Sequence, residues 1–253
     1  MGSATQESQK TQDPVARSAK ARSATVPRTN IVPMSDPQTL IIAPMLGRPD
    51  SVAPFLASLE GTDGCRVVFV CSPGDNPTIE ACRQSGSETI IHDRPQGPGD
   101  YASKINKAYR QSEEPLLFLG AGDLRFHPGW LTAARSKLVG RIGVVGTNDM
   151  GNPRVKAGQH STHSLVTRLY ADLGTIDGPG ILHEGYEHNW CDNELVETAR
   201  HRRSFVFAAA SRVEHLHPAW GKGLNDPIYD LGRDGFQRDK LKFSTRRRLW
   251  SGR

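Results

Sequence analysis

The segment Pro115-Leu-Leu-Phe-Leu-Gly-Ala-Gly-Asp123 joins an apolar run to a glycine-rich turn that ends in an acid. The apolar run predicts a strand buried on both faces. The glycines let the backbone and the Asp123 carboxylate approach a ligand closely. A hard oxygen ligand at this place suits Mg²⁺ or Mn²⁺ bridging two phosphates. An aspartate in the turn before a helix is the equally compatible alternative.

Similar short apolar runs precede and follow this segment, and amphipathic stretches separate them. The predicted strands cover residues 39–44, 66–71, 88–92, 115–119 and 142–146, with a last strand or helix edge at 205–210. Helices are predicted after Asp50, Pro77, Asp100 and Pro128, and over 192–203, with Asp50 and Asp100 as possible caps. Strands that alternate with helices predict a single α/β domain, with a mostly parallel central sheet covered by helices on both faces.

The ends of the chain differ in composition from its middle. Residues 1–37 are polar and basic and predict a disordered leader, with a transit peptide as the alternative. Residues 38–225 form the predicted domain, and residues 226–253 a basic C-terminal extension. The net charge is +5, and the basic extension is either a solvated tail or a patch that attracts phosphates, nucleic acid or an anionic surface.

Cysteine usage and hydropathy favour a cytoplasmic protein. None of the four cysteines belongs to a C-x-x-C pair, which indicates reduced thiols rather than a zinc ribbon or a redox motif. No apolar run approaches the roughly 20 residues that cross a bilayer. The Rossmann, P-loop and G-x-S-x-G signatures are missing, and the interval from His183 to His188 is one residue too long for a zincin.

Ligands of open α/β sheets bind at the carboxyl ends of the strands. Arg48 and Asp50 follow the first predicted strand, Asp75 follows the second and Asp123 the fourth, so these groups should line one edge. Two later features are candidates for chemistry or for surface positions. Acids begin the helix in Cys191-Asp-Asn-Glu-Leu195, and histidines alternate in Val213-Glu-His-Leu-His217.

Five stretches in this order resemble the family 2 glycosyltransferases of GT-A fold, in particular divergent members from bacteriophages and actinobacteria. They are Ile41-Ile-Ala-Pro-Met-Leu-Gly-Arg-Pro49, Gly99-Asp-Tyr-Ala-Ser-Lys-Ile-Asn106, Leu117-Phe-Leu-Gly-Ala-Gly-Asp-Leu-Arg-Phe-His-Pro-Gly-Trp130, Cys191-Asp-Asn-Glu-Leu195 with Arg200, and Val213-Glu-His215. The third resembles the metal-binding DXD strand with its F-x-P-G-W sequel. The resemblance covers roughly residues 38–218.

The resemblance implies a GT-A-like fold and an inverting, metal-dependent transfer of a sugar, of the hexosyltransferase type, from a nucleotide-diphosphate sugar to a hydroxyl. Asp192 would be the general base. Asp123 and His215 would hold Mn²⁺ or Mg²⁺, with His217 as a substitute for His215. Asp75 would contact the base of the donor. The other donor-binding residues would be Pro44, Arg48, Lys104, Asn106 and Gly122. The acceptor would meet Asn148, Asp149, Trp190 and Glu194.

The sequence departs from the family pattern at several site positions. Ala121 replaces the first acid of the DXD, Gly122 its middle position, and Cys191 the acid before Asp192. Metal affinity is therefore expected to be low, with the phosphates supplying most ligands. A non-catalytic nucleotide-sugar or carbohydrate-binding module and a nucleotidyltransferase are the alternatives. The acceptor is left open among glycan, protein and modified DNA, and a nucleic-acid-binding protein acting through the basic extension is a further possibility.

Overall fold

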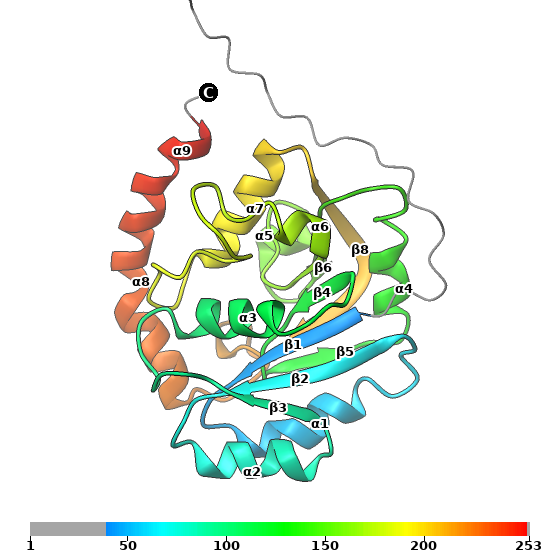
Figure 1. The fold of residues 1–253 in the computed structure, drawn as a ribbon, viewed down its shortest axis with the longest axis vertical. Helices are drawn as coiled ribbons and strands as arrows, with labels where there is room; N and C mark the ends of the chain where they lie inside the picture. Colours follow the sequence, from blue (N-terminus) through cyan, green and yellow to red (C-terminus); the bar gives the residue numbers. More distant parts are fainter. Residues whose placement is uncertain (1–38, 252–253) are drawn as a thin grey trace, which may run out of the picture.

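The structure is a computed structural model that describes residues 39–251, so the predicted leader 1–37 lies outside the described residues. Its centre is one eight-stranded sheet in the order β3-β2-β1-β4-β7-β6-β8-β5 (Figure 1). The strands are β1 (Thr39–Met45), β2 (Cys65–Cys71), β3 (Glu88–Ile91), β4 (Leu116–Leu119), β5 (Leu124–Phe126), β6 (Val144–Asn148), β7 (Ser164–Thr167) and β8 (Phe205–His215). Only β7 and β5 run antiparallel to their neighbours, which confirms the mostly parallel sheet.

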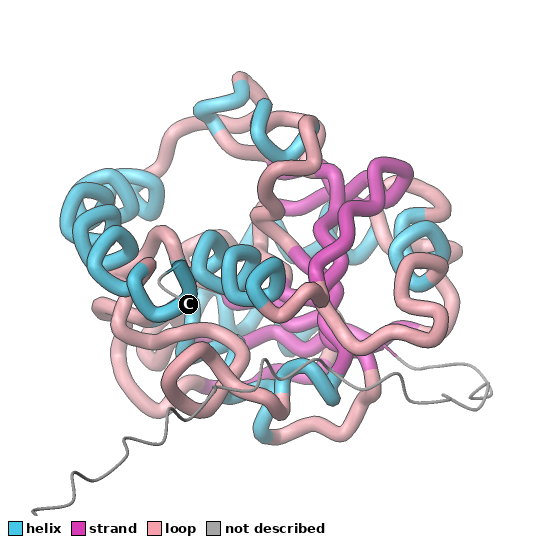
Figure 2. Tube along the Cα trace, turned by 90° about the horizontal axis from the view of Figure 1, so that it is seen from above, coloured by secondary structure: helices cyan, strands magenta, loops and turns pink. Residues whose placement is uncertain are grey.

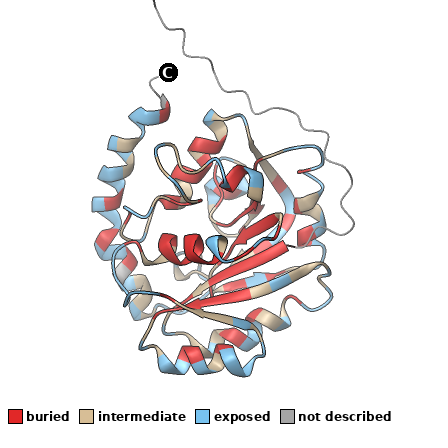
Figure 3. Ribbon diagram, in the orientation of Figure 1, coloured by how far each residue is buried: buried red, intermediate tan, exposed pale blue. Residues whose placement is uncertain are grey.

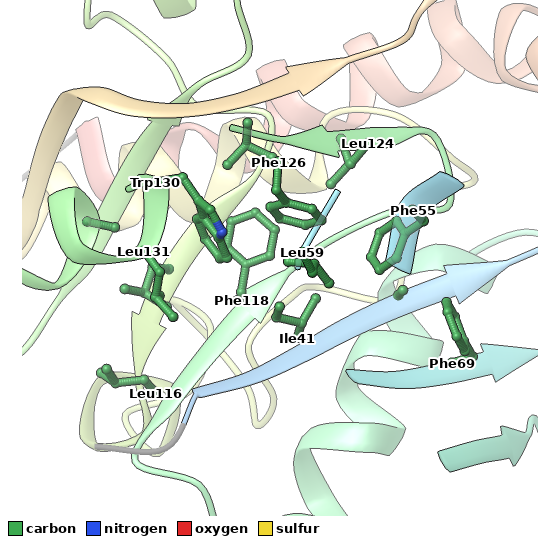
Figure 4. Close-up of a cluster of buried hydrophobic side chains, with 14 of the residues drawn as sticks. Ile41, Phe55, Leu59, Phe69, Leu116, Phe118, Leu124, Phe126, Trp130 and Leu131 are labelled. Atoms are coloured by element: carbon green, nitrogen blue, oxygen red, sulfur yellow. The ribbon is translucent and has the colours of Figure 1, made fainter. Parts of the chain in front are cut away.

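One face of the sheet packs on an aromatic core. The helices on this side are α1 (Val52–Ala57), which follows a 3₁₀ turn at Pro49–Ser51, α2 (Asn76–Gln84) and α4 (Trp130–Arg135). The ring of Phe118 from β4 lies 4.8 Å from that of Trp130, and Phe126 lies 4.7 Å from Trp130 (Figure 4). Large rings that interlock in this way bury much apolar surface and fix the position of β4.

The other face of the sheet is covered by a second set of helices. These are α3 (Asp100–Arg110), α6 (Arg168–Ala171) and α7 (Cys191–His201), and the short α5 (Pro153–Lys156) lies beyond β6. Alternation along the strand sends Leu117 and Leu119 to this side, whereas Leu116 and Phe118 face the aromatic core. Figure 3 shows that the inner strands and the sheet-facing side of α3 are buried. Helices therefore cover both faces, as predicted.

Several local details differ from the sequence-based expectations. Neither expected acid caps its helix, because Ser51 precedes α1 and Gly99, with φ 78°, precedes α3. The strand β5 was not predicted, since it has only three residues. The last strand is longer than the predicted 205–210: after a bulge its end pairs antiparallel with β5, which sets His215 opposite Leu124.

The C-terminal residues form helices that pack beside the sheet. After a 3₁₀ turn at Pro218–Trp220 come α8 (Pro227–Arg246) and α9 (Arg248–Ser251). Seen from above, α8 stands to one side of the sheet (Figure 2). Its rings and charges contact α7 and the loop before it, as described below. Among the described residues, no helix has both the length and the hydropathy needed to span a membrane.

Candidate functional site

A cavity of about 900 Å³ opens at the carboxyl ends of β1 and β4. Most of the residues that the sequence singled out line it, although they come from segments far apart in the chain. The predicted site residues in its wall are Pro44, Arg48, Lys104, Gly122, Asp123, Trp190, Asp192, His215 and His217. The two carboxylates Asp123 and Asp192 thus line one cavity.

Asp123 lies in the turn between β4 and β5 and collects several donors. Its Oδ2 accepts hydrogen bonds from Tyr229 Oη at 2.7 Å and Arg48 Nη1 at 3.0 Å, and lies 3.3 Å from His215 Nε2. Its Oδ1 is buried and has no hydrogen-bond partner among the described residues. Burial alone would raise the pKa of this carboxyl, but His215 and Arg48 hold it well below its usual range. Asp123 is therefore an ionised carboxylate with one oxygen that has no hydrogen-bond partner in the described part of the chain.

The turn before Asp123 passes close to Met45 at Gly122. A Cβ on Gly122 would lie 2.7 Å from the sulfur of Met45, which is closer than carbon and sulfur can pack. The absence of a side chain at this position lets the turn pass directly over the end of β1. The glycine thereby brings the Asp123 carboxylate to the cavity wall.

His215 reaches Asp123 because the end of β8 pairs with β5. Burial would lower the pKa of His215, but the Asp123 carboxylate raises it. Its Nδ1 is buried without a hydrogen-bond partner in the described part of the chain. His217 lies farther along, and its Nδ1 accepts the backbone N–H of Ala219 at 3.0 Å. Burial and the charge of His215 lower the pKa of His217 to about 4.

Asp123 and His215 provide the carboxylate and the imidazole that could hold a divalent cation beside the cavity. Within residues 39–251 the only group of three or more such ligands lies elsewhere, at Asp177, His183 and Glu194. In that group Arg246 already donates to both carboxylates, so a guanidinium takes the place of a cation. The Asp123 site fits a cation that takes its remaining ligands from phosphate oxygens and water.

Two cations line the same side of the cavity. The guanidinium of Arg48 pairs with Asp123 and, through Nε at 2.7 Å and Nη2 at 3.2 Å, with Asp226. Burial would lower the pKa of Arg48, but the Asp226 and Asp123 carboxylates raise it. Lys104 is 1% exposed. Its Nζ donates to the carbonyl of Met45 at 2.8 Å and forms an ion pair with Asp100 Oδ2 at 2.7 Å. Both side chains are therefore held in place at the cavity wall.

Asp192 begins α7 on another side of the cavity. The residue two before it, Trp190, adopts a left-handed φ of 71°, which turns the chain sharply into the helix. Asp192 Oδ2 lies 3.1 Å from His160 Nε2, and Oδ1 accepts the N–H of Asn193 at 2.8 Å. Burial would raise the pKa of Asp192, but His160 and the Asn193 N–H lower it overall. The carboxylate is ionised at neutral pH and can accept a proton from a hydroxyl.

The other predicted donor residues and the remaining acceptor candidates do not line the cavity. Asp75 accepts the N–H of Gly47, in the loop that follows β1, at 2.7 Å and does not line the cavity. Asn106 is buried on α3 and uses its amide on the backbone of Ile181 and Leu182. These two side chains hold loops in position, so neither meets the cavity as the resemblance implied.

Three of the four acceptor candidates are likewise engaged in the protein itself. Asn148 binds the backbone of Met150 and Ala209. Asp149 is 1% exposed and accepts the N–H groups of Gly151 and Asn152 as well as the Thr162 hydroxyl. Glu194 is 2% exposed and binds Tyr186 and Arg246. Polar residues that follow a strand or begin a helix often make such local bonds.

Sequence reasoning missed three residues that contact Asp192, Asp123 or Arg48 in the cavity wall. His160 touches Asp192, Tyr229 touches Asp123, and Asp226 grips Arg48. His160 lies between the strand predicted at 142–146 and the helix predicted at 192–203, with no motif around it. The start of α8 did carry a signal, because Asp226-Pro227 is the cap-and-proline pair that opens helices, and Asp226 accepts the N–H groups of Ile228 and Tyr229.

Comparison with known proteins supports the fold. No family model matches the sequence, and no curated protein matches it either. Among solved structures, a mannosyltransferase from Pyrobaculum calidifontis bound to GDP-Man and Mn²⁺ aligns with a TM-score of 0.58 at 15% identity, over 75% of this chain and 60% of that chain. A second structure is the glucosyl-3-phosphoglycerate synthase of Mycobacterium tuberculosis in complex with Mn²⁺, UDP-glucose and phosphoglyceric acid. It aligns with a TM-score of 0.58 at 16% identity, over 83% of this chain and 79% of that chain.

A third structure, S. aureus TarS residues 1–349, aligns with a TM-score of 0.55 at 13% identity, over 70% of this chain and 59% of that chain. This chain therefore spans about three fifths of the mannosyltransferase and of the TarS fragment. The shared architecture is the GT-A-like arrangement of a curled mixed sheet with helices on both faces. The fold class predicted from the sequence is confirmed.

Proposed function

We propose that this protein transfers a sugar from a nucleotide-diphosphate sugar to an acceptor hydroxyl, with a divalent metal and with inversion at the anomeric carbon. One observation carries the proposal: Asp123 and Asp192 line a single cavity but have different surroundings. Each carboxylate has a histidine partner, but Asp123 also accepts from Arg48 and Tyr229 and keeps one buried oxygen free of partners within residues 39–251. Asp192 instead accepts a backbone N–H at the start of a helix. Two carboxylates in contrasting environments suit two roles in one reaction.

On the donor side, Asp123 and His215 would hold Mn²⁺ or Mg²⁺. When bound, such an ion neutralises the charge that develops on the leaving diphosphate. Arg48 and Lys104 add fixed positive charge in the same wall. With Ala121 in place of an acid, the protein offers two ligands, and diphosphate oxygens would complete the coordination. The Mn²⁺ and nucleotide sugars bound to two of the structural neighbours support this assignment.

On the acceptor side, Asp192 would take the proton of the acceptor hydroxyl as its oxygen bonds to the anomeric carbon. The bond from that carbon to the diphosphate breaks on the opposite face, and its electron pair leaves with the diphosphate. His160 would hold the Asp192 carboxylate in position. Trp190, whose ring lies 5.6 Å from that of Phe236, would offer the acceptor an apolar wall.

A panel of nucleotide sugars with Mn²⁺, beginning with UDP-glucose and GDP-mannose, tests this function by release of nucleoside diphosphate. Asp192→Asn should lower kcat by about 10²- to 10⁴-fold, because it removes the base, and should leave donor affinity unchanged. An Asp192→Asn enzyme of full activity would remove Asp192 from the mechanism. A product with the donor's anomeric configuration would contradict inversion.

The same panel separates the alternatives. Release of pyrophosphate from nucleoside triphosphates would identify a nucleotidyltransferase. Binding of nucleotide sugars without any turnover across an acceptor panel of glycans, peptides and modified DNA would identify a binding module. Either result would replace the transferase proposal.

A further inference from the structure

The first turn of α8 lies on the donor side of the cavity. Asp226 forms a two-point ion pair with Arg48, with its Oδ2 2.7 Å from Nε and its Oδ1 3.2 Å from Nη2. The ring of Tyr229 covers the same guanidinium, with 4.4 Å from Cζ to the ring centre. Ile228 packs against the loop that carries Arg48, because a Cβ on Gly47 would lie 3.5 Å from its Cδ1. This turn of helix therefore closes over Arg48.

The pairing of Asp226 with Arg48 matches the way that an arginine binds a phosphate. A guanidinium offers parallel N–H groups along its edge, and both carboxylates and phosphates accept them in pairs. Asp226 fills the Nε–Nη2 edge, and Asp123 accepts from Nη1. A donor phosphate that approached Arg48 would meet an edge that is already occupied.

The local charge points the same way. The single positive charge of Arg48 lies between the carboxylates of Asp123 and Asp226. The Arg48 side chain is 18% exposed and that of Asp226 is 32% exposed, so the pair is only partly screened by solvent. A diphosphate entering this region would be repelled by Asp226 and would gain little from an arginine whose charge is already matched.

We propose that the Asp226 carboxylate stands in for a donor phosphate on Arg48, so that the donor must displace it and Asp226 sets the donor affinity of the site. This inference rests on the proposed function, because it takes Arg48 as a diphosphate ligand. Displacement would leave the helix start intact, since Asp226 Oδ1 also accepts the N–H groups of Ile228 and Tyr229. The residues of this turn, 226–229, are exposed or half-buried, so a shift of the turn uncovers no fully buried side chain.

The variant Asp226→Asn separates the charge from the helix cap. Asparagine caps helices about as well as aspartate, but it carries no charge toward Arg48. Titration calorimetry with UDP and with GDP, each with Mn²⁺, should show binding about tenfold tighter than in the wild type, as expected for removal of a partly buried charged competitor. Equal or weaker binding would overturn the proposal, because Asp226 would then be neutral or would orient Arg48 for the phosphate.

Asp230→Asn is the matched control, since it makes the same charge change one turn along α8. Asp230 is exposed, pairs with Arg233 and does not line the cavity. The nucleotide affinity of the Asp230→Asn variant should stay within about twofold of the wild type. If Asp230→Asn tightened binding as much as Asp226→Asn, the effect would come from net charge and the proposal would fail. Thermal unfolding midpoints of both variants verify that α8 remains folded.

A double variant tests whether Asp226 acts through Arg48. In an Arg48→Met background, Asp226→Asn should no longer change nucleotide affinity. Tightening that persisted there would overturn the proposed competition. If neither the wild type nor Asp226→Asn bound any nucleoside diphosphate, the proposed function would fail as well. Wild-type binding that Asp226→Asn left unchanged would remove this inference alone.

Discussion

Two regions of the molecule form the walls of the same cavity but are held in place by different forces. The strands β1 and β4 are fixed by apolar burial, with Ile42 and Phe118 both 0% exposed. Helix α8 is largely exposed, and it is attached by a few buried or half-buried charged groups together with the rings of Phe236 and Phe243 on Trp190. The comparison teaches that a wall of a binding site can depend on a few charged groups, and that such a wall responds to charge in a way that the core does not.

The polar attachments of α8 are specific. Asp239 is fully buried and accepts three consecutive backbone N–H groups, from Glu187 at 2.7 Å, His188 at 2.9 Å and Asn189 at 2.8 Å. Arg246 donates two hydrogen bonds of 2.7 Å to Glu194 on α7. These contacts fix the loop that leads into Asp192. Together with Asp226 on Arg48, they connect α8 to both sides of the cavity.

The largest effect should come from the sheet. Phe118→Ala removes a ring that packs on Phe126 and Trp130 and leaves a cavity in the aromatic core. We expect the free energy of unfolding to fall by about 3–5 kcal/mol, by the same amount at low and high salt. Denaturant unfolding at two salt concentrations measures this. Leu241→Ala, at a 70% exposed position on α8, is the control and should stay within about 0.5 kcal/mol. A loss of less than about 0.5 kcal/mol for Phe118→Ala would contradict the view that apolar burial fixes β4.

An intermediate effect is expected at His163, beside the end of β4. Its Nδ1 donates to the carbonyl of Leu119 at the end of β4, and its ring lies 5.0 Å from that of His215. Burial and the neighbouring His215 lower the pKa of His163 to about 4. As the pH falls, the His163 imidazole is protonated near pH 6.5 in the unfolded chain but only near pH 4 in the folded chain. The free energy of unfolding therefore declines between pH 6.5 and pH 4, by about 3 kcal/mol.

His163→Asn checks this pH dependence. The amide can still donate to Leu119 but does not titrate, so the loss of stability between pH 6.5 and pH 4 should be smaller than in the wild type by about that amount. Denaturant unfolding at both pH values provides the comparison. Identical pH slopes for the two proteins would show that His163 is not held neutral by the fold.

The smallest effect concerns the attachment of α8. Asp239→Ala leaves three backbone N–H groups without their acceptor and should lower the free energy of unfolding by about 2 kcal/mol. Its neighbour Arg238 pairs with Glu187 at an exposed position, and Arg238→Ala should cost less than about 0.5 kcal/mol. Chemical denaturation distinguishes the two. Equal losses would mean that α8 is held by its charges in general rather than by Asp239.

The sheet could be predicted from the sequence because its strands are short apolar runs separated by amphipathic helices. The run Leu116–Leu119 and the glycine turn before Asp123 were sufficient to place that carboxylate at the edge of the sheet. The strand β5 was not predicted because three residues are too few to show a hydrophobic periodicity. The continuation of β8 to His215 was not predicted, because its register depends on pairing with β5, and that pairing is a tertiary contact.

The site was harder to predict because polar residues have two possible uses. Asp149 and Asn106 are residue types that often bind ligands, but in this fold their polar atoms form hydrogen bonds with backbone groups. Helix α8 looked like a basic extension, since Asp226 and Asp239 find their partners in segments distant in the sequence. Only the tertiary structure shows that these acids accept from Arg48 and from the loop before Asp192.

The proposed function depends on a metal that Asp123 binds and that a nucleoside diphosphate shares. Calorimetric titration of UDP and GDP into the wild type and Asp123→Ala, each with and without Mn²⁺, tests it most directly. We predict that Mn²⁺ strengthens nucleotide binding to the wild type and that Asp123→Ala abolishes this enhancement. An enhancement that survived in Asp123→Ala, or nucleotide binding to the wild type that ignored Mn²⁺, would contradict the account.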